Sequence, residues 1–116
     1  MIEAQGLVKR FKKVVAVDKL SFTVHDGEVF GLLGPNGAGK TTTLRLLATV
    51  LEPNAGTATV NGYDIRTQKD QVRATLGLLV EDAGLYRKIT AREHLRYFGR
   101  LHGMDGPALE QQSDYL

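Results

Sequence analysis

The sequence of 116 residues contains no cysteine. Without thiols, the chain has neither disulfides nor thiolate metal sites, which fits a reducing compartment. Its apolar runs are much shorter than the roughly 20 residues that cross a membrane, and its first residues lack the basic and apolar regions of a signal peptide. We therefore expect a cytoplasmic chain with no direct membrane insertion, whose role at a membrane comes through a partner.

Surplus charge is scarce as well. The 15 basic and 13 acidic residues give a net charge of +2, and no long block of like charge is present. Such a balance gives no support for binding nucleic acid. The hydrophobic content of 42% is ordinary for a globular protein, and the length is that of one domain or less.

A phosphate-binding loop is the most informative feature that is present. The residues GPNGAGKT at 34–41 match the pattern G-x-x-x-x-G-K-[ST] in full. Its glycines let successive backbone N–H groups turn inward toward an anion. Lys40 adds a charge for the β- and γ-phosphates, and the Thr41 hydroxyl is placed to bind Mg²⁺.

The flanks of this loop have the pattern that such a loop requires. Residues 28–33 are nearly all apolar, as in a strand buried on both faces. After the loop, apolar residues recur at helical spacing until Pro53 stops the helix. They predict a helix that packs on a sheet through Leu44, Leu47, Ala48 and Leu51.

Further elements are predicted on both sides of this unit. Alternation and turn signals predict strands at 2–11, 14–17, 20–24 and 56–60, and a second buried strand at 76–80 beside the loop strand. A polar surface helix is predicted at 65–74. Thr90 and Glu93 form a capping box for a late helix that ends at Gly103. The apolar face of this helix has Ala91, Leu95, Phe98 and Leu101. A further helix is predicted to begin at Pro107.

These elements predict a mixed α/β fold of the phosphate-loop NTPase type, with an antiparallel N-terminal β part, truncated before the later core strands. At this point the residues resemble a known family. The whole chain, 1–116, is similar to the N-terminal half of an ATP-binding cassette, the nucleotide-binding subunit of ABC transporters. The resemblance rests on LVKRF at 7–11, GEVFGLLGPNGAGKTT at 27–42, EPNAGT at 52–57 and NGYDI at 61–65, followed by GLY at 84–86 and by Thr90, Glu93 and Leu95. Cassettes of multidrug and sodium exporters are the most similar.

The resemblance implies an ATP site with Mg²⁺ and assigns residues to it. Phe11 falls where the family has an aromatic ring that stacks on adenine, an interaction of about 1–3 kcal/mol; the alternative is a core aromatic on an early strand. Lys40 has a catalytic role toward the phosphates, and Thr41 binds the metal. The phosphates contact the loop residues Gly34, Pro35, Asn36, Gly37, Ala38, Gly39, Lys40, Thr41 and Thr42.

Glu81 departs from the family pattern, because the residue after this strand is normally Gln. A carboxylate is a suitable hard ligand for Mg²⁺, but it adds negative charge beside the γ-phosphate. The resemblance therefore implies a metal-binding and catalytic position at Glu81, and the alternative is a solvated loop acid. His25, His94 and His102 are too scattered to form a site.

The second half of a cassette supplies motifs that this sequence lacks. No LSGGQ-like signature loop, strand ending in Asp-Glu, or following switch histidine is present. The resemblance also implies partners, namely a membrane-spanning transporter subunit and a second cassette. Two other functions stay open: a complete small phosphate-loop NTPase or kinase with residues 78–82 as its acidic strand end, and a non-catalytic ATP-binding module.

Overall fold

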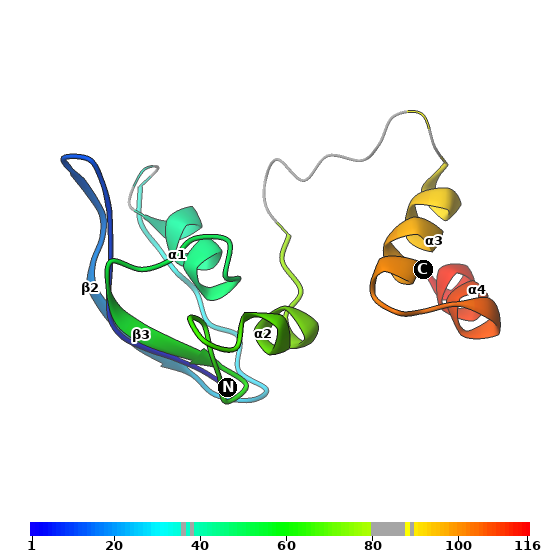
Figure 1. Cartoon of the computed structure of the whole chain (residues 1–116), viewed down its shortest axis with the longest axis horizontal. Helices are drawn as coiled ribbons and strands as arrows, with labels where there is room; N and C mark the ends of the chain where they lie inside the picture. Colours follow the sequence, from blue (N-terminus) through cyan, green and yellow to red (C-terminus); the bar gives the residue numbers. More distant parts are fainter. Residues whose placement is uncertain (36, 38, 80–87, 89) are drawn as a thin grey trace. The chain divides into compact units, whose positions relative to one another are not determined.

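A computed structural model of the chain describes residues 1–35, 37, 39–79, 88 and 90–116. The chain divides into two compact units, Met1–Val80 and Glu81–Leu116. The first unit contains β1 (Ile2–Phe11), β2 (Val14–Val24), α1 (Lys40–Leu47), β3 (Ala55–Val60), β4 (Tyr63–Asp64) and α2 (Lys69–Thr75). The second contains α3 (Ala91–Leu101) and α4 (Gly106–Tyr115) (Figure 1).

The first unit is built on an antiparallel sheet with the strand order β2–β1–β3–β4. The predicted N-terminal strands are confirmed, but the segments expected at 14–17 and 20–24 form one continuous strand, β2. Lys19 has a φ of 49°, and the β1–β2 register shifts between Leu7 and Lys9. This irregularity bends the strand without ending it, as β-bulges do. The expected antiparallel N-terminal part of the α/β fold is thus present.

The two helices of the first unit pack against this sheet through a single apolar core. Its buried residues are Ala4, Leu7, Val17, Leu46, Leu47, Ala58, Val60, Ile65 and Val72. In α1 the buried face includes Leu46, which is fully buried, whereas the predicted Leu44 is 39% exposed. A helix with two adjacent apolar stripes has its inner face selected by the sheet below it, and sequence spacing does not distinguish the two.

The helix predicted at 65–74 begins later than expected, and it contributes the buried Val72 to the core instead of lying wholly on the surface. The carboxylate of Asp64 accepts hydrogen bonds from the backbone N–H groups of Arg66 at 2.7 Å and Thr67 at 3.1 Å. Such a local turn competes with helix formation and delays the start of α2 to Lys69. The backbone hydrogen bond from Arg66 is also the main reason that the pKa of Asp64 lies below its ordinary value.

The buried parallel strands expected at 28–33 and 76–80 are not formed in the described part of the chain. Residues 28–33 and 76–79 belong to no helix or strand, and Val80 lies outside the described residues. Val29 is fully exposed, Leu33 is 96% exposed and Leu79 is 86% exposed. An apolar run becomes a buried strand only when neighbouring strands satisfy its backbone groups, and the described residues supply none to these two segments.

The second unit is a pair of helices joined by a short turn. The capping box predicted at Thr90 and Glu93 is confirmed, with both reciprocal hydrogen bonds present. Leu109 of α4 is buried against Gly99 of α3, whereas the predicted apolar positions Ala91 and Leu101 are exposed. Arg96 holds Glu110 in a two-pronged ion pair, with Nε–Oε1 at 2.7 Å and Nη2–Oε2 at 3.1 Å.

This ion pair predicts a pH dependence for the second unit. The hydrogen bond that Arg96 donates to the Glu110 carboxylate holds the pKa of Glu110 below the ordinary value of 4.5. A carboxyl whose pKa is lowered by folding stabilises the folded state above its unfolded pKa, and this contribution is lost as the pH falls through the folded pKa. NMR shifts of α4 should therefore move toward random-coil values below about pH 4.5.

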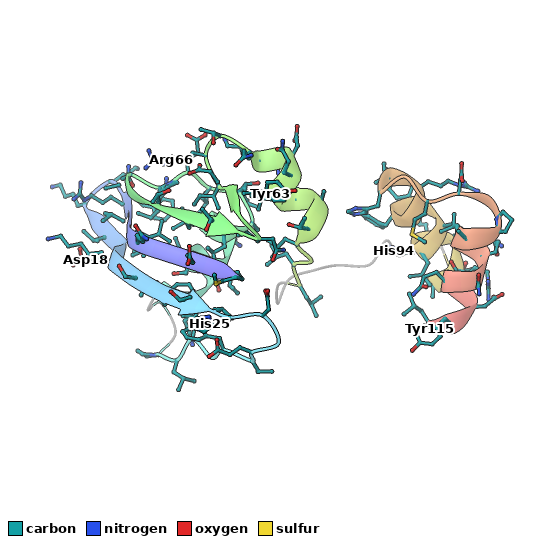
Figure 2. The ribbon with its side chains drawn as sticks, turned by 90° about the horizontal axis from the view of Figure 1, so that it is seen from below. Asp18, His25, Tyr63, Arg66, His94 and Tyr115 are labelled. Atoms are coloured by element: carbon teal, nitrogen blue, oxygen red, sulfur yellow. The ribbon has the colours of Figure 1, made fainter. Side chains whose placement is uncertain are left out.

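The matched variants for this titration are Glu110→Gln and Asp18→Asn. Glu110→Gln should weaken the α3–α4 pair at pH 7, and its difference from the original chain should shrink as the pH falls and Glu110 becomes protonated. Asp18 is an exposed carboxyl on β2 (Figure 2), so its replacement should leave the α4 shifts unaffected. A Glu110→Gln protein that matches the original chain at pH 7 would show that the ion pair contributes nothing measurable.

Candidate nucleotide-binding site

Two glycines of the phosphate-loop sequence, Gly37 and Gly39, adopt a backbone that favours anion binding. Gly37 and Gly39 have φ values of 84° and 89°, in the left-handed region. Gly39 is the N-cap of α1, so the helix begins without a side-chain cap, and its first turn contains no acidic residue. The first N–H groups of a helix have no partner within the helix, and the helix dipole is positive there. This end of α1 is therefore suited to a phosphate group.

Gly39 also packs tightly against the sheet. A Cβ atom added at this position would lie 2.1 Å from the carbonyl oxygen of Ala16, in β2. Only glycine permits this approach, which fixes the start of α1 on β2. Thr43 strengthens the junction, because its buried hydroxyl donates to the Gly39 carbonyl oxygen at 2.8 Å. Thr43 thus has a structural role at this junction.

Lys40, Thr41 and Thr42 form the first turn of α1. The Lys40 ammonium group donates to the carbonyl oxygen of Gly34 at 2.5 Å, so it lies across the loop that it follows in sequence. Thr41 is exposed and Thr42 is half-buried. The Lys40 ammonium group and the Thr41 hydroxyl are therefore both at the start of α1, where a phosphate and its cation would meet.

Phe11 lies at the end of β1 and is 44% exposed. It is therefore not a core aromatic, which was the alternative raised by the sequence. The Lys9 ammonium group lies over its ring, 5.3 Å from the centroid. Sequence reasoning missed Lys9, although its spacing of two residues from Phe11 on a strand places both side chains on one face.

The strand register brings Phe11 toward the start of α1. Gly39 approaches Ala16 and Val17 of β2, and Val17 is the ladder partner of Lys9. Phe11 is two residues beyond Lys9, about 7 Å along the strand. The aromatic ring and the phosphate loop are thus attached to neighbouring positions of one hairpin, although they are far apart in sequence.

Three predicted site residues lie outside the described residues: Asn36, Ala38 and Glu81. The metal-binding and catalytic roles of Glu81 therefore remain predictions, as does the GLY segment at 84–86. In the described part of the chain, no group of His, Asp and Glu residues could hold a metal ion. His25 lies just after β2 and His94 in α3 (Figure 2).

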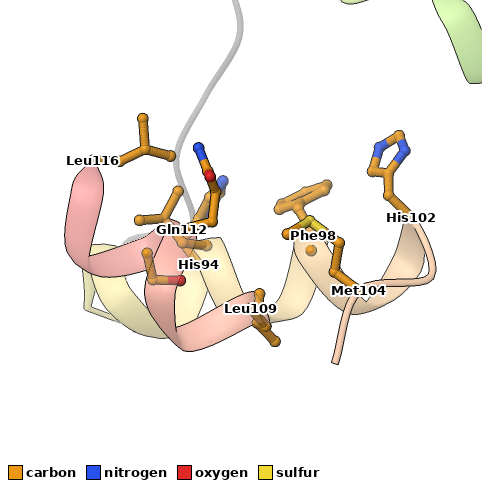
Figure 3. A pocket seen from close by; sticks show the side chains of 10 residues that line it. His94, Phe98, His102, Met104, Leu109, Gln112 and Leu116 are labelled. Atoms are coloured by element: carbon orange, nitrogen blue, oxygen red, sulfur yellow. The ribbon is translucent and has the colours of Figure 1, made fainter. Parts of the chain in front are cut away.

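A hollow of about 280 Å³ lies within the second unit, between α3 and α4 (Figure 3). It is lined by His94, Leu95, Phe98, Gly99, His102, Met104, Leu109, Gln112, Ser113 and Leu116. The lining residues that the structure describes include no lysine or arginine, so they do not suit a triphosphate. The candidate nucleotide site is therefore the phosphate loop of the first unit.

Comparison with known proteins places this loop in a family. The family described as "ABC transporter" matches residues 17–115. The chain belongs to this family. The ABC transporter ATP-binding protein NatA of Bacillus subtilis is 48% identical to this chain over 110 residues. The match covers 90% of this chain and 45% of NatA. The daunorubicin/doxorubicin resistance ATP-binding protein DrrA of Streptomyces peucetius is 46% identical, over 88% of this chain and 31% of DrrA.

A solved structure described as the ATP-binding subunit of an ABC transporter has the same fold. It superimposes with a TM-score of 0.82 at 29% identity, over 95% of this ABC chain and 46% of that chain. The chain thus spans less than half the length of NatA, of DrrA and of this solved subunit. Among the described residues, every helix is too short or too polar to cross a membrane.

Proposed function

We propose that this chain forms the ATP-binding part of an ABC transporter subunit and binds Mg-ATP at residues 34–42. The observation that carries the proposal is the uncapped start of α1, which follows two left-handed glycines and has no acidic residue in its first turn. The names of NatA and DrrA support ATP as the nucleotide. The name of DrrA also favours a drug-exporting transporter.

In the proposed complex, the backbone N–H groups of the loop and of the first turn of α1 hold the phosphates. The Lys40 ammonium group leaves the carbonyl oxygen of Gly34 and binds the β- and γ-phosphates instead. Thr41 contributes a hydroxyl ligand to Mg²⁺, and the bound cation would neutralise phosphate charge. The exposed Thr41 at the helix start fits this role. Glu81 is proposed as a further metal ligand and as a catalytic residue.

Calorimetric titration of the 116-residue chain with Mg-ATP tests the proposed site directly. Tripolyphosphate with Mg²⁺ should compete, because most contacts are to phosphate. Binding of ATP that tripolyphosphate does not displace would contradict a site centred on the loop.

The role of Phe11 in the proposed site predicts an effect that depends on the base. Phe11→Ala should weaken the binding of Mg-ATP by about 1–3 kcal/mol, because the stacking surface for adenine is lost. Phe11→Tyr should be nearly neutral, since it keeps the ring. An equal loss of affinity for tripolyphosphate would show instead that Phe11 acts on the structure of the loop.

We also propose that the complete protein hydrolyses ATP on the cytoplasmic side, together with a second cassette and a membrane-spanning subunit. The signature loop and the Asp-Glu strand that hydrolysis needs do not occur in this sequence. Phosphate release by the 116-residue chain alone is therefore expected to stay well below about 1 s⁻¹, the low end for ordinary enzymes. Faster turnover that is lost in both Lys40→Ala and Glu81→Gln would favour a small complete NTPase.

A further inference from the structure

Lys9 is in direct contact with the proposed adenine platform. Its ammonium group lies over the Phe11 ring at 5.3 Å from the centroid, within the range of cation–π attraction. The same group donates a hydrogen bond to the carbonyl oxygen of Glu52 at 2.9 Å. Lys9 therefore joins the end of β1 to the segment that follows α1.

The segment that holds Lys9 is itself anchored. Lys69 of α2 forms an ion pair with the carboxylate of Glu52, and Arg66 donates to the carbonyl oxygen of Pro53 at 3.3 Å. The side-chain oxygen of Asn54 accepts a hydrogen bond from the backbone N–H of Arg10 at 2.6 Å. The backbone N–H of Asn54 donates to the carbonyl oxygen of Val8. Residues 52–54 are thus tied to β1 on either side of Lys9. The ammonium group has a fixed attachment rather than a free one.

Phe11 needs such support because its ring has no hydroxyl group for a hydrogen bond. A half-exposed ring that turns freely loses rotational freedom when a base stacks on it, which weakens binding. A cation held over the ring restricts that motion before the base arrives. With 44% of Phe11 exposed, ring surface that Lys9 does not cover remains accessible.

We propose that Lys9, attached to Glu52, is a positioning residue that holds the Phe11 ring for the adenine base. The proposal rests on the proposed ATP site and assigns to Lys9 a part in recognising the base. Lys9 acts through Phe11 and makes no contact with phosphate. The hydrogen bond to Glu52 supports this distinction, since it directs the ammonium group toward a carbonyl oxygen.

The test compares two variants. Lys9→Met keeps the length of the aliphatic part of the side chain and removes the charge. Lys13→Met removes the same charge from the exposed β1–β2 turn. Each protein is titrated with Mg-ATP and with tripolyphosphate plus Mg²⁺. Lys9→Met should weaken ATP binding about two- to fivefold, the range of an exposed cation–π contact. Tripolyphosphate binding should be unchanged, Lys13→Met should be neutral for both, and Lys9→Arg should restore ATP binding.

Two further measurements separate positioning from other effects. In a Phe11→Ala background, Lys9→Met should have no additional effect on ATP affinity, because the ring through which it acts is gone. NMR contacts between the Lys9 side chain and the Phe11 ring should be visible without nucleotide. If Lys9→Met weakens tripolyphosphate binding equally, Lys9 faces the phosphates, and if it strengthens ATP binding, Lys9 blocks the ring; either result overturns the proposal.

Failure of the proposed function gives a different pattern. If the unaltered chain binds neither Mg-ATP nor tripolyphosphate, the nucleotide site is wrong and the platform role falls with it, even if NMR shows the contact. If the unaltered chain binds both but Lys9→Met binds ATP equally well, the site stands and the role of Lys9 is refuted.

Discussion

Lys40→Ala is expected to weaken the binding of Mg-ATP by about 10- to 100-fold, because hydrogen bonds to a charged group contribute about 1.5–3 kcal/mol. Lys40 is the only cationic residue in the segment 34–42, so no neighbour in the loop replaces it. Its ammonium group already lies on the loop, through the hydrogen bond to Gly34. The affinity for tripolyphosphate should fall by a similar factor, which distinguishes this loss from that in Phe11→Ala.

The matched control is Lys13→Ala, which makes the same change on the exposed β1–β2 turn. Lys40 contacts Gly34 at an exposed position, so Lys40→Ala should unfold at nearly the same temperature as the original chain. Calorimetry that gives equal dissociation constants for Lys40→Ala and Lys13→Ala would remove Lys40 from the site.

The local features of this chain could be read from its sequence. The glycine pattern of the loop, the turn between β1 and β2, and the capping box at Thr90 and Glu93 each depend on residues close together in the chain. Backbone conformation at such positions is set by local sterics and local hydrogen bonds. Sequence motifs therefore predict them well, and the family resemblance added the identity of the ligand.

The features that the sequence did not predict depend on contacts between distant segments. Residues 28–33 have the composition of a buried strand, but a strand also needs partners for its backbone, and the described residues provide none. Similarly, the burial of Leu46 in place of Leu44 reflects how α1 lies on the sheet. The contact between Lys9 and Phe11 was foreseeable only from strand periodicity combined with exposure of the ring.

The exposure of these apolar segments has a consequence for the proposed complete protein. Val29, Leu33 and Leu79 are mostly exposed, and exposed apolar strand segments favour association with other strands. The relatives extend well beyond the length matched by this chain. Their additional residues are the proposed source of the strands that cover these segments.

Gly39→Ala is expected to reduce both the stability of the first unit and its binding of nucleotide. Gly39 has a φ of 89°, and an added Cβ would lie 2.1 Å from the carbonyl oxygen of Ala16. The left-handed backbone alone costs about 1–3 kcal/mol for a residue with a side chain. The clash with a backbone atom adds to this cost, because β2 must move away from the start of α1. We expect lower stability in chemical denaturation and a loss of Mg-ATP affinity of at least about 100-fold.

Two other glycines separate the contributions to this effect. Gly37 has a φ of 84° with no atom within 4 Å of an added Cβ, so Gly37→Ala introduces backbone strain without a clash. Gly31 has neither problem, and Gly31→Ala should leave stability unchanged. The free energy of unfolding should therefore fall in the order Gly31→Ala, Gly37→Ala, Gly39→Ala. If Gly39→Ala were as stable as Gly37→Ala, the close approach of Gly39 to Ala16 would not fix α1 on β2, and the loop would owe its position to other contacts.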